Sequence, residues 1–213
     1  MTAVSDAAAQ AAIGAAAREL HLPTVRDQAA RLADFNADAV PSLAPGQLAR
    51  LASGTYLDNG EPVVLLGDSG TGKTHLLIGL GLAACEQGRR VRYVTTAALV
   101  NELVEAAGQR ALSRVVGRYG RLDLLLLDEL GYVQVDPRGA ELLSQIITER
   151  EERASIAIGT NLPFSEWGTV FPDPRLVAAI VDRVTFNAHI LETGTQSYRL
   201  RTTKTAARAK NPS

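Results

Sequence analysis

The clearest chemistry in this sequence belongs to a glycine-rich stretch that reads Gly67-Asp68-Ser69-Gly70-Thr71-Gly72-Lys73-Thr74. It fits the pattern G-x-x-x-x-G-K-[ST], in which the glycines let consecutive backbone N–H groups turn toward one anion. A helix that starts at Lys73 would present its positive end to the same point. The pattern predicts a phosphate-binding loop, in which Lys73 reaches the β- and γ-phosphates and the Thr74 hydroxyl holds Mg²⁺. The alternative is a glycine-rich turn that binds nothing.

The residues around this loop supply the context that the pattern requires. A short apolar strand, 62–66, precedes it, and an apolar helical run with Leu76, Leu77, Leu80 and Ala84 follows it.

An acidic pair, Asp128-Glu129, ends a nearly continuous apolar run over 122–127. Such runs are typical of a parallel strand that is buried on both faces. Ligands of open parallel sheets bind at the carboxyl ends of the strands, so we expect this pair to lie near the phosphate loop. Asp128 would then take an outer-shell position on Mg²⁺, and Glu129 would polarise the attacking water. Two ordinary acids at a strand end are the alternative.

Two further polar side chains are candidates for the same chemistry. Asn161 ends the strand predicted over 155–160, where it would orient the water or sense the γ-phosphate; a capping asparagine is the alternative. Arg183 lies on a predicted helix and projects roughly 110° away from the centre of its apolar stripe. It would be free to act as an arginine finger on the γ-phosphate of a neighbouring subunit. An ordinary surface arginine is the alternative.

A basic stripe is predicted on a helix over 109–119, because arginines recur there at spacings of four, four and three. Such a stripe would contact a phosphate backbone or a neighbouring subunit, and a solvated helix face is the alternative. Its members are Arg110, Arg114, Arg118 and Arg121.

The rest of the chain must position these groups, and its pattern alternates strand and helix from residue 62 onward. Further strands are predicted over 91–95 and 188–192. One helix is predicted over 97–107, with Thr96 as its N-cap. Two more helices are predicted to start at Asp136-Pro137 and at Asp173-Pro174. Five strands with intervening helices predict an α/β fold with a doubly wound, five-stranded parallel sheet. With 213 residues and 46% apolar composition, the chain is long enough for one such domain and a small appendage.

Charge and cysteine content indicate an ordinary cytoplasmic protein. The net charge is −1, although residues 197–213 carry five basic and no acidic side chains. A single cysteine, Cys85, allows no disulfide framework, and no apolar stretch approaches the length of a membrane span. The three histidines have no metal-ligand spacing.

Several of these motifs together resemble the IstB-like transposition helper ATPases, which belong to the DnaA/DnaC-related initiator clade of AAA+ proteins. The resemblance covers about residues 20–201. It is carried by Gly72-Lys73-Thr74-His75-Leu76, Asp128-Glu129-Leu130-Gly131-Tyr132, 160–167, Asp182-Arg183 and Ser197-Tyr198-Arg199-Leu200.

The resemblance implies a P-loop NTPase of AAA+ type, with ATP and Mg²⁺ as cofactors, that assembles as a homo-oligomer on duplex DNA and recruits or activates a transposase. In this clade the helical insertion between the second and third strands contacts DNA and neighbouring subunits, which would include the arginine stripe. We expect a short, truncated helical appendage over 1–34, a linker over 35–61, the AAA+ domain with a minimal lid over 62–201, and a basic tail over 202–213. We assign the nucleotide to the phosphate loop and the residue after it, namely Gly67, Asp68, Ser69, Gly70, Thr71, Gly72, Lys73, Thr74 and His75.

The leading hypothesis is an ATPase in which Lys73, Glu129, Asn161 and Arg183 are catalytic and Thr74 and Asp128 serve the metal. Three rivals remain open from the sequence. They are a replicative-helicase loader of the same clade, a truncated remnant that binds ATP without turnover, and a P-loop small-molecule kinase.

Overall fold

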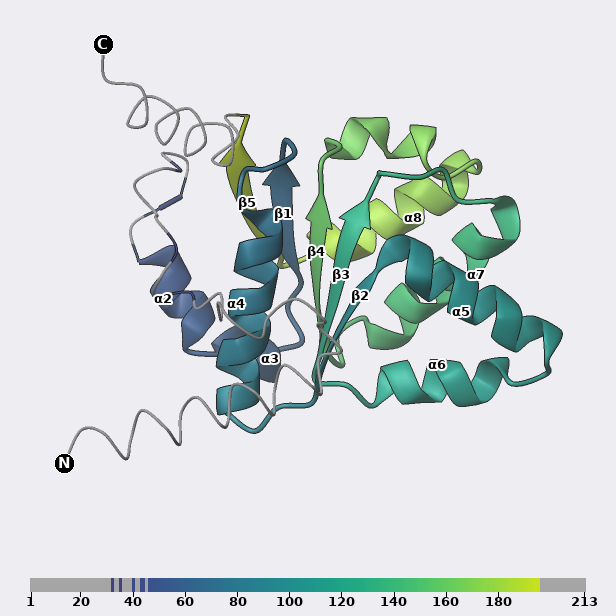
Figure 1. Ribbon diagram of the computed structural model, residues 1–213, viewed down its shortest axis with the longest axis horizontal. Coiled ribbons are helices and arrows are strands. Elements are labelled where there is room, and N and C mark those ends of the chain that lie inside the picture. The colour runs from purple at the N-terminus through teal and green to yellow at the C-terminus, as the bar shows by residue number, and fades with distance from the viewer. Residues whose placement is uncertain (1–31, 33–34, 36–39, 41–42, 45, 196–213) are drawn as a thin grey trace, which may run out of the picture.

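The computed structural model of the chain describes residues 32, 35, 40, 43, 44 and 46–195. The helices predicted within 1–34 and the basic tail therefore lie outside the described residues. The described part holds a five-stranded sheet with helices on both faces (Figure 1). None of its helices is long and apolar enough to cross a membrane.

All neighbouring strands of the sheet are parallel, in the order β2-β3-β4-β1-β5. The predicted α/β fold is thus confirmed, although the sequence did not predict the strand order. The strand that leads into the phosphate loop, β1, lies between β4 and β5. The strands are β1 (Val63–Gly67), β2 (Val91–Thr95), β3 (Leu124–Leu130), β4 (Ser155–Thr160) and β5 (His189–Gly194).

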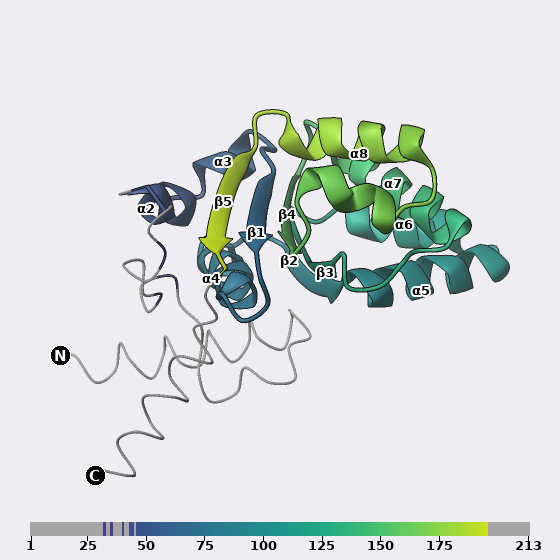
Figure 2. The ribbon, with the colours of Figure 1, turned by 90° about the horizontal axis from the view of Figure 1, so that it is seen from above.

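The two faces of the sheet are covered by different helices (Figure 2). α4 (Lys73–Glu86) covers one face, where Leu124 and Leu126 of β3 pack into the apolar cluster beneath it. Leu125 and Leu127 point to the other face, and their cluster includes side chains from the remaining large helices. Burial on both faces explains why the sequence of this strand is almost continuously apolar. The helices on the second face are α5 (Thr96–Gly108), α6 (Leu112–Gly120), α7 (Pro137–Arg150) and α8 (Pro174–Thr185).

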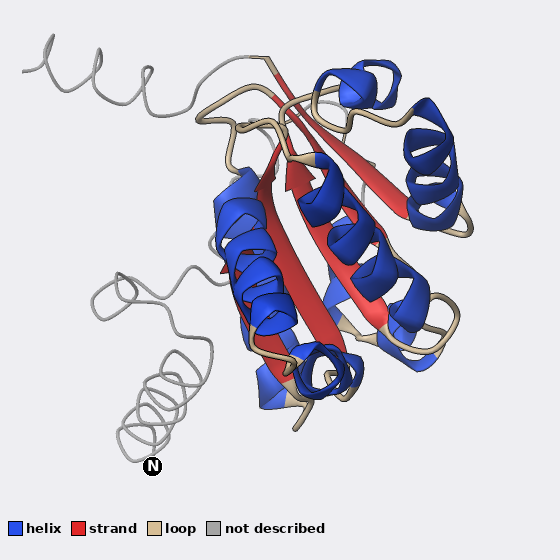
Figure 3. Cartoon of the chain, turned by 90° about the vertical axis from the view of Figure 1, so that its right-hand side faces the viewer, coloured by secondary structure: helices blue, strands red, loops and turns tan. Residues whose placement is uncertain are grey.

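Helix α7 and helix α8 start as predicted. Asp136 accepts hydrogen bonds from the backbone N–H groups of Arg138 and Gly139, and Asp173 accepts one from that of Arg175. A proline follows each cap. Figure 3 shows helices in front of the strands that they cover.

The cap of α5 differs by one residue from the prediction. The Thr95 side chain accepts the hydrogen bond from the backbone N–H of Ala98, while Thr96 is buried and donates to the backbone carbonyl of Asp128 at 3.0 Å. Thr96 thus faces β3 and ties the start of α5 to the end of that strand.

Other element boundaries differ from those predicted. At β3 the backbone pairing extends past the apolar pattern of the sequence. β3 includes Asp128 and Glu129, which the prediction placed after the strand. α6 begins at Leu112, so the predicted helix over 109–119 was wrong at its start. The predicted linker contains two short helices, α2 (Gln47–Ala52) and α3 (Thr55–Asp58). A 3₁₀ helix, η3 (Phe164–Thr169), lies between β4 and α8.

Candidate functional site

The phosphate loop joins β1 to α4 at the carboxyl end of the sheet. Gly70 and Gly72 have φ angles of 82° and 102°, a conformation that favours glycine. Gly72 is the N-cap of α4 and makes no side-chain cap hydrogen bond. The first N–H groups of this helix therefore have no capping side chain to satisfy them and are available to an anion.

The last strand holds the loop from the other side. The backbone N–H of Asp68 donates to the carbonyl of Gly194 at 3.1 Å, and the Thr71 and Thr193 hydroxyl oxygens are 2.6 Å apart. Thr71 is buried, and its hydroxyl also donates to the Asp68 carbonyl. The Thr71 side chain thus shapes the loop, so only its backbone can face a ligand.

Lys73 folds back on the loop that it follows. Its ammonium group donates to the carbonyls of Gly67 at 2.7 Å and Asp68 at 2.8 Å. Burial lowers its pKa, while the charges of Asp128 and Asp68 act in the opposite direction. A phosphate that replaced these carbonyls would give the ammonium group a fully charged partner.

Thr74 and Asp128 are brought together from opposite sides of β4. The Thr74 hydroxyl donates to Asp128 Oδ2 at 2.8 Å, and Asp128 is only 3% exposed. This contact joins the first turn of α4 to the end of β3. The two residues that the sequence assigned to the metal are therefore direct neighbours.

Glu129 directly follows Asp128 in β3. Glu129 is exposed and has a φ angle of 60°, which is unusual for a residue with a side chain. The pairing of β3 with β4 shifts register there, between Leu127 and Leu130. Such irregularities re-aim side chains and are common next to active sites. The bulge turns Glu129 out of the sheet while Asp128 stays buried.

Asn161 follows β4 and packs against the turn after β3. Its Oδ1 atom is buried and has no hydrogen-bond partner. A Cβ atom added to Gly131, whose φ angle is 105°, would lie 3.0 Å from this oxygen. A buried acceptor without a donor is costly, so Asn161 is prepared for a donor such as a water molecule.

Two contributors to this site were missed in the sequence. Gly159 lies in β4 between β1 and β3, and a Cβ there would be 2.5 Å from Asp128 Oδ1. The signal that could have indicated this close approach is an isolated glycine within a predicted strand. Tyr93 on β2 donates its hydroxyl to Asp128 Oδ2 at 2.9 Å. Burial, followed by the charge of Asp128, raises the pKa of Tyr93 far above its ordinary value, so the phenol keeps its proton. No sequence signal could have found Tyr93, because it depends on β2 pairing with β3.

The oxygen atoms at this site fit Mg²⁺ bound together with a nucleoside triphosphate. Thr74 and Asp128 offer hard oxygen atoms, which suit Mg²⁺. Within the described residues, no group of three or more His, Cys, Asp or Glu side chains could hold a metal ion. An ion here would need phosphate oxygens as well, as is usual for Mg²⁺ in nucleotide sites.

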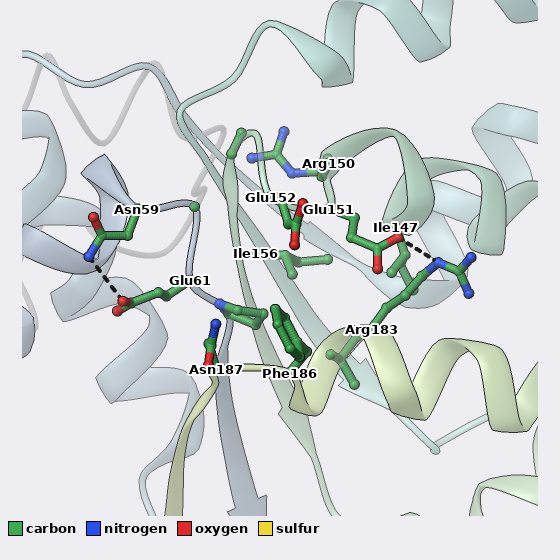
Figure 4. A pocket seen from close by; sticks show the side chains of 14 residues that line it. Asn59, Glu61, Ile147, Arg150, Glu151, Glu152, Ile156, Arg183, Phe186 and Asn187 are labelled. Atoms are coloured by element: carbon green, nitrogen blue, oxygen red, sulfur yellow. Dashed lines mark hydrogen bonds and ion pairs between the residues drawn. The ribbon is translucent and has the colours of Figure 1, made fainter.

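Arg183 lies at the amino end of the sheet, because the cavity that it borders is also lined by Pro62 and Ala154, which directly precede β1 and β4. Figure 4 shows Arg183 beside Glu151. Its Nε atom donates to Glu151 Oε2 at 2.8 Å, and its Nη1 atom donates to the carbonyl of Ala179 at 2.9 Å. It borders a cavity of about 360 Å³, which we call the foot pocket. Its lining includes Glu61, Glu151, Arg183, Phe186 and Asn187.

The structure does not arrange the four arginines of the predicted stripe on one helix. Arg114 and Arg118 lie on α6, whereas Arg110 precedes it with a φ angle of 56° and Arg121 is its C-cap. All four are exposed. Arg118 forms an ion pair with Glu102 of α5 and lies over the Tyr119 ring, 5.4 Å from its centroid.

The other three arginines are not engaged in this way. In the part of the chain that the structure describes, Arg110, Arg114 and Arg121 form no ion pair with a carboxylate. They are the members of the predicted stripe that remain available to an anionic partner.

Comparison with known proteins places this site in context. A protein of Sinorhizobium fredii, named as an insertion sequence ATP-binding protein, is 39% identical over 191 residues. The alignment covers 89% of this chain and 63% of that protein, so the chain spans less than two thirds of its relative's length.

Solved structures show the same fold at lower identity. The DnaC helicase loader aligns with a TM-score of 0.63 and 20% identity over 79% of this chain and 99% of that one. The replication initiator DnaA, bound to AMPPCP and single-stranded DNA, aligns with a TM-score of 0.61 and 22% identity over 84% of this chain and 54% of that one. The fold is therefore that of the DnaA/DnaC P-loop AAA+ domains.

The family of IstB-like ATP binding proteins matches residues 8–206, which is most of the sequence. The resemblance that the motifs suggested is thus confirmed, and the chain belongs to the IstB-like ATP-binding protein family.

Proposed function

We propose that this chain is an ATP-dependent helper of DNA transposition that binds and hydrolyses ATP with Mg²⁺. The observation that carries the proposal is the Thr74–Asp128 hydrogen bond, which places the two expected metal residues together. Mg²⁺ would neutralise charge that develops on the phosphates. The names of the relatives support an insertion-sequence context, and AMPPCP in a structural neighbour supports ATP as the ligand.

The residues at the carboxyl end have distinct roles in this proposal. Lys73 leaves its two carbonyl partners and binds the β- and γ-phosphates. Glu129, which is exposed next to the buried Asp128, accepts a proton from the attacking water. Asn161 uses its unpartnered oxygen to hold that water in position.

Arg183 acts on another copy of the chain in this proposal. It lies at the amino end of the sheet, so it cannot serve the phosphate loop of its own chain. A head-to-tail contact between copies would bring it to the neighbour's γ-phosphate. Arg183 would first have to leave Glu151, since that carboxylate holds its Nε atom.

Duplex DNA is the proposed substrate for assembly, and a transposase is the proposed partner. Arg110, Arg114 and Arg121 are exposed and form no ion pair with a carboxylate among the described residues, so they are the candidates for phosphate contacts. Phosphate contacts carry little sequence information, which predicts weak sequence preference.

The test is ATP turnover measured over a wide range of protein concentration, with and without long duplex DNA, while assembly size is followed in the same samples. We expect turnover per chain to rise with concentration and with DNA, and DNA stimulation to fall steeply as salt rises. The Lys73→Ala variant should lose nucleotide binding. Normal ATP affinity in that variant, or turnover per chain that is independent of concentration, would contradict the proposal.

The same samples distinguish the rivals. ATP binding without turnover under any condition would indicate a remnant. Preference for single-stranded DNA, with capture of a replicative helicase in place of a transposase, would indicate a helicase loader.

A further inference from the structure

Asp128 is held by three donors, and one of them lies outside every sequence motif. Its Oδ1 atom accepts from the backbone N–H of Glu129 at 2.9 Å. Its Oδ2 atom accepts from Thr74 at 2.8 Å and from the Tyr93 hydroxyl at 2.9 Å. The orientation of this carboxylate thus depends on Tyr93 as much as on Thr74.

Tyr93 reaches Asp128 because of the strand order. It pairs with Leu126 in the middle of β2, while Thr95 pairs with Asp128 itself. Its half-buried ring packs into the apolar cluster beneath α4. Tyr93 and Thr74 therefore approach Oδ2 from the face of the sheet that α4 covers.

The hydroxyls of Thr74 and Tyr93 both donate to Asp128 Oδ2, and this leaves the Thr74 oxygen available to a metal ion. Because Thr74 donates its hydrogen to Asp128, its lone pairs remain free for Mg²⁺. Mg²⁺ demands near-ideal geometry, so a carboxylate that rotates would weaken the site. Partners of metal-site carboxylates are worth about 10–100-fold in metal affinity.

We propose that Tyr93 is a positioning residue for the Mg²⁺ site. Its hydroxyl holds the Asp128 carboxylate in the orientation that serves both the ion and the Thr74 hydroxyl. This inference rests on the proposed function, because it requires Mg²⁺ and ATP at this site.

The test compares the full chain with its Tyr93→Phe variant, which keeps the ring and removes the hydroxyl. ATP binding is titrated by calorimetry at a series of free Mg²⁺ concentrations and once in EDTA. We expect the half-saturating Mg²⁺ concentration to rise about tenfold, while the affinity for ATP in EDTA stays unchanged. A loss of the same size in EDTA, or no change with Mg²⁺, would overturn the inference.

Tyr119→Phe is the matched control. Tyr119 also donates its hydroxyl to a carboxylate, Glu102, at 2.6 Å, but it lies on α6. Both variants lose a phenol–carboxylate hydrogen bond, so their melting temperatures should fall by similar amounts. Only Tyr93→Phe should change the Mg²⁺ dependence; an equal change in Tyr119→Phe would overturn the inference.

A double-mutant cycle with Asp128→Asn decides whether Tyr93 acts through Asp128. Removal of the Tyr93 hydroxyl should have little further effect on Mg²⁺ dependence in the Asp128→Asn background. A full tenfold effect in that background would show that Tyr93 does not act through Asp128. Wild-type protein that binds ATP without any Mg²⁺ dependence would instead contradict the proposed function.

Discussion

The two ends of the sheet hold their functional side chains in different ways. At the carboxyl end, Lys73, Thr74 and Asp128 are bonded to one another or to nearby backbone. At the amino end, Arg183 is held by Glu151 beside the foot pocket, and no phosphate loop is near it. The first end is organised by one chain alone. In the mechanism that we propose, the second end supplies a cation that acts on the nucleotide of another chain.

Loss of Arg183 should give the largest effect. Arg183→Ala should lower ATP turnover by about 10³–10⁵-fold and leave ATP binding intact, because an arginine finger acts on the transition state. Turnover and equilibrium ATP binding, measured on the same preparation, check this. Arg175→Ala, a change at an exposed arginine of the same helix, should leave turnover unchanged.

Mixing sharpens this comparison between the two ends. Arg183→Ala retains a complete carboxyl end, and Lys73→Ala retains a complete amino end. A mixture of the two inactive variants should recover part of the wild-type turnover, because one supplies the arginine to the other's ATP. Undiminished turnover in Arg183→Ala alone would remove this arginine from catalysis.

Glu129→Gln tests the carboxyl end by itself. The amide cannot accept a proton from the attacking water, so we expect turnover to fall by about 10²–10⁴-fold. ATP affinity should stay close to that of the wild type, as measured by calorimetry. Glu141→Gln, a change at an exposed glutamate of α7, is the control, and a similar loss of turnover there would argue against a specific role for Glu129.

Glu151→Gln should have the opposite sign. The ion pair with Arg183 is partly exposed and worth at most about 1 kcal/mol, so its loss should release Arg183 by no more than about fivefold. We expect turnover at low protein concentration to rise by up to this factor. Glu149→Gln removes the neighbouring ion pair with Arg153 and should change nothing. Reduced turnover in Glu151→Gln would mean that the pair positions Arg183 instead of restraining it.

The smallest effect concerns acid stability at the foot pocket. A hydrogen bond from His189, at 2.7 Å, lowers the pKa of Glu61 below its ordinary value of 4.5. The unfolded chain therefore binds this proton first as pH falls, so the stability gained from Glu61 is full above about pH 4.5 and is lost as pH falls further.

Thermal melts of Glu61→Gln and wild type check this pH dependence. The wild type should be more stable by no more than about 1 kcal/mol at neutral pH, and the difference should shrink below pH 4.5. ATP affinity should be equal in the two proteins at neutral pH. A stability difference that grows on acidification would contradict the assignment.

Sequence reasoning predicted the elements of this fold better than their contacts. The phosphate loop and the capped starts of α7 and α8 follow from local rules, and the structure contains them where expected. The bulge at Glu129 was missed because the end of the strand was predicted from the end of the apolar run at Leu127, whereas the backbone pairing continues to Leu130. The bond from Tyr93 to Asp128 was missed because a sequence without strand order does not say which strands are neighbours.

The last strand of the described chain completes the phosphate loop, and this has a consequence for biosynthesis. Gly194 accepts from Asp68, and Thr193 lies against Thr71, although these pairs are separated by more than one hundred residues in the chain. Contacts between residues so far apart in sequence form late in folding. A nascent chain that has not yet released β5 would carry every residue of the phosphate motif but would lack these contacts with the loop. Competence to bind ATP should therefore appear abruptly once β5 has left the ribosome.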